Sequence, residues 1–129
     1  MVKTYLILLL SLVAYALNIN AQVTSEPSPL QEDSQDVTIF FHADEGNKGL
    51  MGLNVSTKIY AHTGVLVNGG NDWKYAPTWG DNSTKYELTY VSENLWKLYI
   101  GDIREYYGVA DPAEKVTKLA FVFRNANGS

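Results

Sequence analysis

The sequence predicts an all-β domain, an antiparallel β-sandwich with one short helical turn. Short runs of β-branched and aromatic residues recur at regular spacing after residue 36, and turns rich in Gly, Asn and Asp separate them. The aromatic residues are mostly tyrosine and tryptophan, with 9 Tyr and 3 Trp against 4 Phe, which is typical of β domains with a polar face. The chain has no cysteine, so a hydrophobic core must stabilise the fold without disulfides.

Residues 1–21 have the layout of a secretory signal peptide. Lys3 supplies a positive charge, residues 5–17 are almost entirely apolar, and Ala21 is the small residue expected before a cleavage site. A membrane anchor is the less favoured interpretation, because the apolar run is shorter than the ~20 residues that a spanning helix needs. We therefore expect a secreted protein, extracellular, at the cell surface or periplasmic, with no membrane contact after cleavage.

The next segment, residues 22–35, is rich in Ser, Pro, Glu and Gln and is predicted to be a flexible leader. The domain itself is predicted to span residues 36–129. Its first strand is expected at residues 37–43 and its second at 58–63, because both runs contain several β-branched or aromatic residues. A long loop is expected over residues 65–78.

The second half of the domain has the clearest periodicity. Residues 85–91 and 95–100 alternate between apolar and polar positions on either side of a short turn, which predicts a hairpin. Asp102 is placed to cap a helical turn over residues 103–107. Residues 115–124 are apolar on both faces, which predicts a central strand. Together these elements predict an immunoglobulin-like sandwich.

The last residues of the chain carry a strong turn signal. Residues 125–128 read Asn-Ala-Asn-Gly, a pattern typical of hairpin turns. A hairpin turn needs a strand on each side, and Ser129 is the final residue. We therefore expect that the sandwich lacks its last strand and that the domain is truncated at its C-terminus.

Five rings gather within a short polar stretch of the sequence. Tyr60 and His62 lie two residues apart on a predicted strand and so share one face, and Trp73, Tyr75 and Trp79 follow in a glycine-rich loop. Flat apolar rings suit the C–H faces of sugars, whose hydroxyls need hydrogen bonds at the edges. The pattern predicts a carbohydrate-binding surface; packing of the same rings in the core is the alternative.

Polar side chains in the same stretch are expected to hydrogen-bond the sugar hydroxyls. The candidates are Lys74, Asn71, Asp72 and the ring of His62. Trp96 is different, because it alternates with apolar residues along a predicted strand. We expect Trp96 to lie in the core.

The ring pattern resembles the starch-binding modules of carbohydrate-binding module families 25 and 26. A Tyr-x-His pair with spacing 2 is followed, 11 positions later, by a loop tryptophan. The resemblance implies that Tyr60, His62 and Trp73 cradle adjacent glucose units of an α-glucan, either starch or a maltooligosaccharide. The wider chain also resembles modules that precede α-amylase-type catalytic domains in secreted proteins of Bacteroidetes-like bacteria, which implies that a catalytic domain follows. The sequence segments that carry this wider resemblance are residues 46–50, 60–65, 72–75, 78–82, 94–96, 106–109 and 119–124.

The helical shape of amylose gives a physical reason for such an arrangement. Successive α-1,4-linked glucose units turn relative to one another, so two rings set at an angle fit them. A flat row of coplanar rings suits cellulose better. One ring on a strand and one on a loop are expected to make that angle.

Other classes of site have weaker support. The formal net charge of −4 makes nucleic acid an unexpected partner. The 2 histidines lack metal-ligand spacing and no Gly-x-Ser-x-Gly occurs, so no metal or other cofactor is expected. The pairs Asp44-Glu45 and Asp81-Asn82 could bind a structural calcium ion together with backbone carbonyls, although the spacing of an EF-hand loop is missing. The carboxylates lie mostly in turns rather than in an apolar pocket, so no catalytic residue is predicted.

The sequence therefore predicts a non-catalytic module that binds α-glucan and holds a secreted glycoside hydrolase near its substrate. Such tethering raises the effective concentration of the catalytic domain at the polymer. The alternative is a ligand-free, immunoglobulin-like spacer domain of a secreted or surface protein. A glycan-binding adhesin without a hydrolase is a variant of the binding hypothesis.

Overall fold

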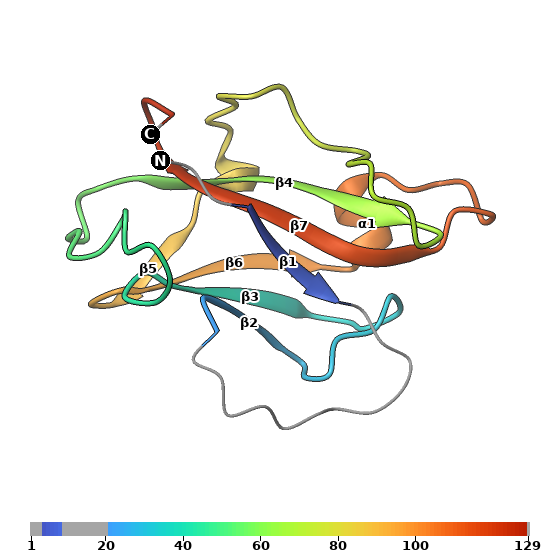
Figure 1. Ribbon diagram of the computed structural model, residues 1–129, viewed down its shortest axis with the longest axis horizontal. Helices are drawn as coiled ribbons and strands as arrows, with labels where there is room; N and C mark the ends of the chain where they lie inside the picture. Colours follow the sequence, from blue (N-terminus) through green and yellow to red (C-terminus); the bar gives the residue numbers. More distant parts are fainter. Residues whose placement is uncertain (1–3, 9–20, 129) are drawn as a thin grey trace.

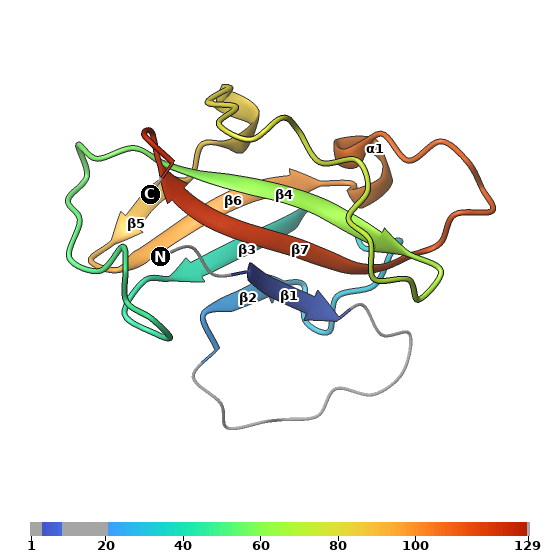
Figure 2. The same cartoon turned by 45° about the horizontal axis from the view of Figure 1, so that its top comes forward.

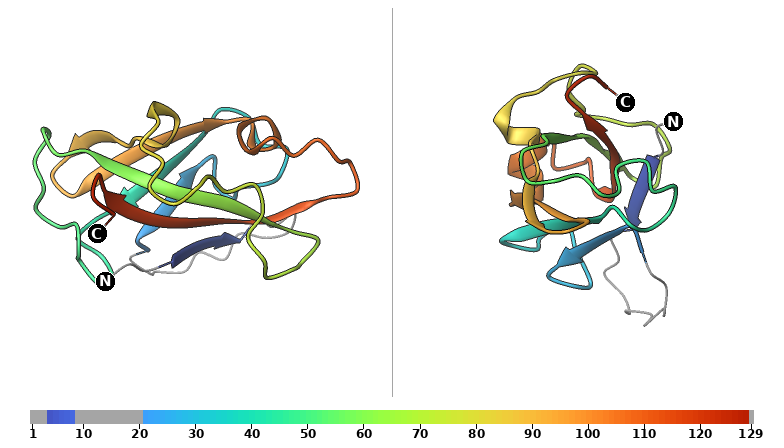
Figure 3. Two further views of the ribbon diagram at one scale, coloured as in Figure 1. Left: turned by 90° about the horizontal axis from the view of Figure 1, so that it is seen from above. Right: turned by 90° about the vertical axis from the view of Figure 1, so that its left-hand side faces the viewer.

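Two antiparallel sheets pack face to face in the computed structural model, which describes residues 4–8 and 21–128 (Figure 1). The first sheet has the strand order β1-β7-β4, formed by Thr4–Leu8, Val116–Asn125 and Ile59–Val67. The second has the order β2-β3-β6-β5, formed by Val23–Glu26, Val37–His42, Leu95–Gly101 and Thr89–Ser92. The predicted all-β, antiparallel sandwich is confirmed, and the end view in Figure 3 shows its two layers.

The core lies between the sheets because the strands alternate between buried and exposed positions. In β3 every second residue is buried, as expected for a strand with one face on the core. Phe41 of β3 stacks on Phe123 of β7 across the two sheets, with ring centroids 4.2 Å apart. Trp96 of β6 is only 2% exposed, which confirms that it is a core residue.

Two short helical segments accompany the strands. The 3₁₀ helix η1, Thr84–Tyr86, precedes β5, and the helix α1, Ile103–Tyr107, follows β6. Asp102 caps α1 as predicted, since its side chain accepts a hydrogen bond from the backbone N–H of Glu105 at 2.8 Å. Gly108 ends the helix in the left-handed conformation that favours glycine.

The predicted hairpin is confirmed, since β5 and β6 pair antiparallel. Its first strand is shorter than predicted, because residues 84–88 do not belong to it. They form η1 and an isolated bridge to β4 rather than the first part of β5. β7 is the central strand of its sheet, as predicted from its two apolar faces. β4 is longer than expected, because it continues past residue 63 to Val67.

The segment expected as a flexible leader instead contributes to the sandwich. β2 pairs with β3, and Leu30 is buried in the core. Glu32 forms an ion pair with Arg104 at 2.9 Å. Polar composition concealed this role, because backbone pairing, polar contacts and few buried apolar side chains anchor the segment.

The N-terminal strand β1 comes from the predicted signal peptide. Thr4–Leu8 pairs antiparallel with β7, and Tyr5 and Ile7 pack against the core. Residues 9–20 of the same predicted peptide lie outside the described residues. Cleavage after Ala21 therefore stays a prediction. None of the helices in the described ranges has the length and apolar character to cross a membrane.

Candidate functional site

The predicted ring residues lie over the outer face of β4, on the side away from the core. Tyr60, His62 and Gly64 alternate along this face, while Ile59, Ala61 and Val65 enter the core. After β4 the chain turns and runs back above the strand toward η1, as Figure 2 shows. This returning segment, residues 68–83, is called the covering loop below.

Backbone pairing attaches the covering loop to β4. The N–H of Val65 donates to the carbonyl of Lys74 at 2.9 Å, and the N–H of Lys74 donates to the carbonyl of Val65 at 2.8 Å. Gly64 makes this approach possible. A Cβ atom there would lie 2.9 Å from the carbonyl oxygen of Lys74 and 3.0 Å from Cβ of Ala76. A side chain at this position would therefore push the covering loop away from the strand.

The pairing brings three rings together, His62, Trp73 and Trp79. With Tyr75, whose hydroxyl donates a hydrogen bond to Glu114, we call them the aromatic cluster. His62 stacks on Trp73 with centroids 5.6 Å apart and planes 20° apart, and it meets Trp79 edge-on at 4.9 Å and 61°. His62 and Trp73 are half-buried. Trp79 and Tyr75 are 48% and 40% exposed. The cluster thus has a supported centre and two rings that reach solvent.

Tyr60 does not offer its ring to solvent, which corrects the expectation that it is a stacking platform. It is only 5% exposed. The guanidinium carbon of Arg124 lies 5.3 Å from the centroid of Tyr60 and 5.8 Å from that of Trp79. Because Arg124 lies between these two rings, Tyr60 supports the cluster from beneath instead of contacting a ligand.

Arg124 holds the covering loop to β7. Its guanidinium donates to the carbonyl of Asp81 at 2.6 Å, to the side-chain oxygen of Asn82 at 2.7 Å and to its neighbour Asn125 at 3.0 Å. The side chain is 1% exposed, and no carboxylate of the described residues forms an ion pair with it. Neutral oxygens and the faces of two rings therefore stabilise this buried charge.

Glu114 organises the polar edge of the cluster. Its carboxylate accepts from the ammonium of Lys74 at 2.7 Å and from the hydroxyl of Tyr75. These two hydrogen bonds lower the pKa of Glu114 and raise the pKa values of Lys74 and Tyr75. Lys74 keeps further N–H donors for a ligand, since an ammonium has three.

His62 is held in its neutral form near pH 7. Burial, and to a smaller extent the positive charge of Arg124, lower the pKa of its imidazole. A neutral imidazole has one donor nitrogen and one acceptor nitrogen, so it can either donate a hydrogen bond to a hydroxyl group or accept one from it.

The described residues contain no group of three or more His, Cys, Asp or Glu side chains that could hold a metal ion. The Glu114 carboxylate beside Tyr75 has a lowered pKa and two donors bound to it. A glycosidase acid needs the opposite shift. The cluster offers rings for stacking and polar groups for hydrogen bonds.

Three contributors to the site were missed by the sequence analysis. Gly64 had a recognisable signal, because a glycine inside a strand often marks a close approach of another backbone. Arg124 and Glu114 had none, since their partners are distant in sequence. No protein-family model matches the chain, and no curated protein matches it. The resemblance to starch-binding modules therefore stays a prediction from the residues.

Proposed function

We propose that the aromatic cluster binds an α-glucan chain and that the domain thereby targets a secreted glycoside hydrolase to starch-like substrate. The angle between the indoles supports this proposal most directly. Trp73 is inclined by 20° to His62 and Trp79 by 61° to the same ring, so the two indole planes differ by at least 61° − 20° = 41°. An inclined pair suits the turning α-1,4 chain rather than a flat polymer. We assign to Trp79 the role of stacking on glucose that the sequence analysis expected of Tyr60.

The polar groups around the cluster match the hydroxyls of such a chain. Lys74 supplies donors, the Glu114 carboxylate supplies acceptor sites, and neutral His62 supplies either. The C–H faces of successive glucose units would lie on the inclined pair Trp79 and Trp73, and Tyr75, which is also open to solvent, would contact a further unit. Two large exposed rings in one loop also favour a binding surface over a ligand-free spacer.

Retention on starch tests the proposal. In a native gel that contains soluble starch, Trp79→Ala and Trp73→Ala should migrate like proteins that do not bind, with far-UV circular dichroism unchanged. Val91→Ala is the control, because Val91 is an apolar residue 44% exposed, close to the 48% of Trp79, but lies on β5 of the other sheet. Equal retardation of the tryptophan variants and the parent protein would refute the proposal.

Tryptophan fluorescence distinguishes the glucan from other polymers. Maltoheptaose should change the emission of the parent protein, and cellohexaose should change it little, because the inclined indoles fit only the turning chain. A spacer domain would respond to neither sugar. A stronger response to cellohexaose would contradict the assignment of α-linkage.

A further inference from the structure

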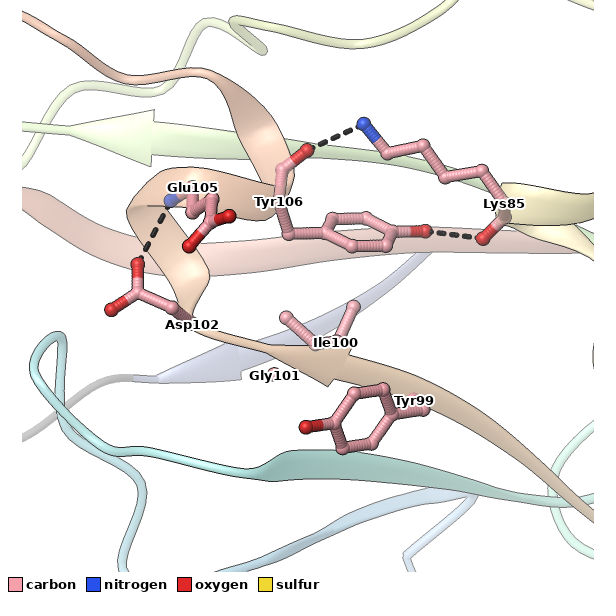
Figure 4. Close-up of a pocket in the computed structure, with 7 residues that line it drawn as sticks. All are labelled: Lys85, Tyr99, Ile100, Gly101, Asp102, Glu105 and Tyr106. Atoms are coloured by element: carbon pink, nitrogen blue, oxygen red, sulfur yellow. Dashed lines mark hydrogen bonds between the residues drawn. The ribbon is translucent and has the colours of Figure 1, made fainter.

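A second surface, built from β6, α1 and η1, also combines an exposed ring with a pocket. It lies where the end of β6 meets α1 and η1 (Figure 4). Tyr99 of β6 is 61% exposed, the most exposed aromatic ring of the described residues. Beside it lies an open pocket of about 440 Å³. An exposed ring next to a pocket is the usual form of a small-molecule contact surface.

Tyr99 is held in place although it is exposed. Its hydroxyl donates to the Asp36 carboxylate at 3.1 Å. A Cβ atom at Gly101 would lie 3.3 Å from Cε2 of Tyr99 and 3.4 Å from its hydroxyl oxygen, so the ring rests on a position without a side chain. A ring fixed before binding loses little conformational entropy when a ligand stacks on it.

The opposite wall of the pocket is equally well fixed. The Lys85 ammonium donates to the carbonyl of Tyr106 at 2.6 Å, and the Tyr106 hydroxyl donates to the carbonyl of Lys85 at 2.8 Å. Figure 4 shows these two reciprocal bonds above the pocket. They join η1 to α1, so the pocket walls come from three elements that are locked together.

The charges of the pocket favour a neutral, hydroxylated ligand. The Lys85 ammonium already lies 4.6 Å from the centroid of Tyr106, the place that a cationic ligand would take. Asp102 and Glu105 repel an anion. The carboxylate of Glu105 has no hydrogen-bond partner among the described residues and is left to accept hydroxyl protons. Lys85 has N–H donors left for hydroxyl oxygens.

We propose that this pocket is a second sugar site, in which one unit of a glucan stacks on Tyr99 and neighbouring units hydrogen-bond Glu105 and Lys85. The identity of the sugar rests on the proposed function, while the position of the site does not. Two weak sites on one domain bind a polymer more strongly than either alone, because the second contact is intramolecular.

Nuclear magnetic resonance separates the two sites in one experiment. Each has a glycine amide beneath an aromatic ring, Gly101 under Tyr99 and Gly64 beside Trp73. Titration of the full chain with maltoheptaose should shift both amide resonances. Tyr99→Ala should raise the dissociation constant followed at Gly101 by about tenfold or more and leave the constant at Gly64 unchanged.

Two matched variants control for indirect effects. Tyr99→Phe keeps the ring and loses only the bond to Asp36, so it should retain most of the affinity at Gly101. Lys97→Ala, two residues earlier on the same face of β6, should change neither site. Melting temperatures close to that of the parent would show that all three variants are folded.

Each outcome decides between the two proposals. A shift at Gly64 alone overturns the second site and leaves the proposed function standing. A shift at Gly101 alone supports the second site and overturns the aromatic cluster as the glucan site. No shift at either glycine overturns both.

Discussion

The two sheets of the sandwich differ in what covers their outer faces. The outer face of β4 and β7 is buried almost as well as the core, since none of five residues on it is more than 6% exposed: Tyr60, Leu66, Ala120, Val122 and Arg124. The outer face of β6 is open, and Lys97 and Tyr99 lie in solvent. The covering loop causes this difference, because it lies over the outer face of β4. A sheet with two apolar faces needs a second layer over its outer face, and here the covering loop forms that layer and carries rings of the candidate site.

Removing Arg124 should have the largest effect on this difference. Arg124→Ala leaves the carbonyl of Asp81 and the amide of Asn82 without their donor and opens a cavity between Tyr60 and Trp79. We expect a loss of about 3 kcal/mol in the free energy of unfolding, measured with urea. Arg124→Lys, which keeps the charge but not the planar fork, should lose less. Wild-type stability of the alanine variant would show that the guanidinium does not hold the loop.

Gly64→Ala should push the covering loop away from β4. The new Cβ atom would meet the Lys74 carbonyl at 2.9 Å, so the covering loop must move. We expect a cost of about 1–3 kcal/mol and a larger relative loss of starch retention, because Trp73 moves with the loop. Gly49→Ala is the control, since its Cβ would meet nothing closer than 3.6 Å. If both variants retain starch equally, the close approach is not needed for binding.

Deleting residues 1–21 should weaken the first sheet at its other edge. The deletion removes the backbone partner of β7 and the half-buried side chains of Tyr5 and Ile7. We expect a lower urea midpoint, corresponding to about 1–2 kcal/mol, with the aromatic cluster unchanged because it lies on β4. Identical midpoints for the two chains would mean that β1 contributes no net stability.

Acidification should have the smallest effect. The pKa of His62 is lowered in the folded state, so the unfolded chain binds more protons as the pH falls. The contribution of His62 to the free energy of unfolding is fully present above the ordinary histidine pKa of about 6.5. It is lost as the pH drops through the lower pKa that His62 has in the folded protein. His62→Asn should therefore show a smaller fall in stability between pH 7.5 and pH 5 than the parent. A parallel pH dependence in both proteins would place the titrating group elsewhere.

Local signals predicted the parts of the fold that depend on neighbours in sequence. The alternation around Trp96 predicted a core strand, and Asp102 predicted a helix cap, because each pattern has a direct steric or hydrogen-bonding cause. The expected proximity of His62 and Trp73 is confirmed, because the chain turns back soon after the end of β4 and the two rings stack.

Contacts between residues distant in sequence determine the features that local patterns did not predict. Tyr60 is buried because Arg124, which is 64 positions away, lies on it, and no local pattern in the sequence indicates this contact. The polar segment 22–35 enters the fold through Leu30 and the pair of Glu32 with Arg104. A prediction of which ring faces solvent therefore needs the register between β4 and β7.

The pairing of β1 with β7 places two demands on the same five residues. Thr4–Leu8 lies inside the segment predicted to direct export, and an export signal must be free for the translocation machinery to bind. If residues 1–21 are the export signal that the sequence predicts, a molecule that has completed its first sheet with β1 hides part of that signal, so folding and export would compete for the same five residues.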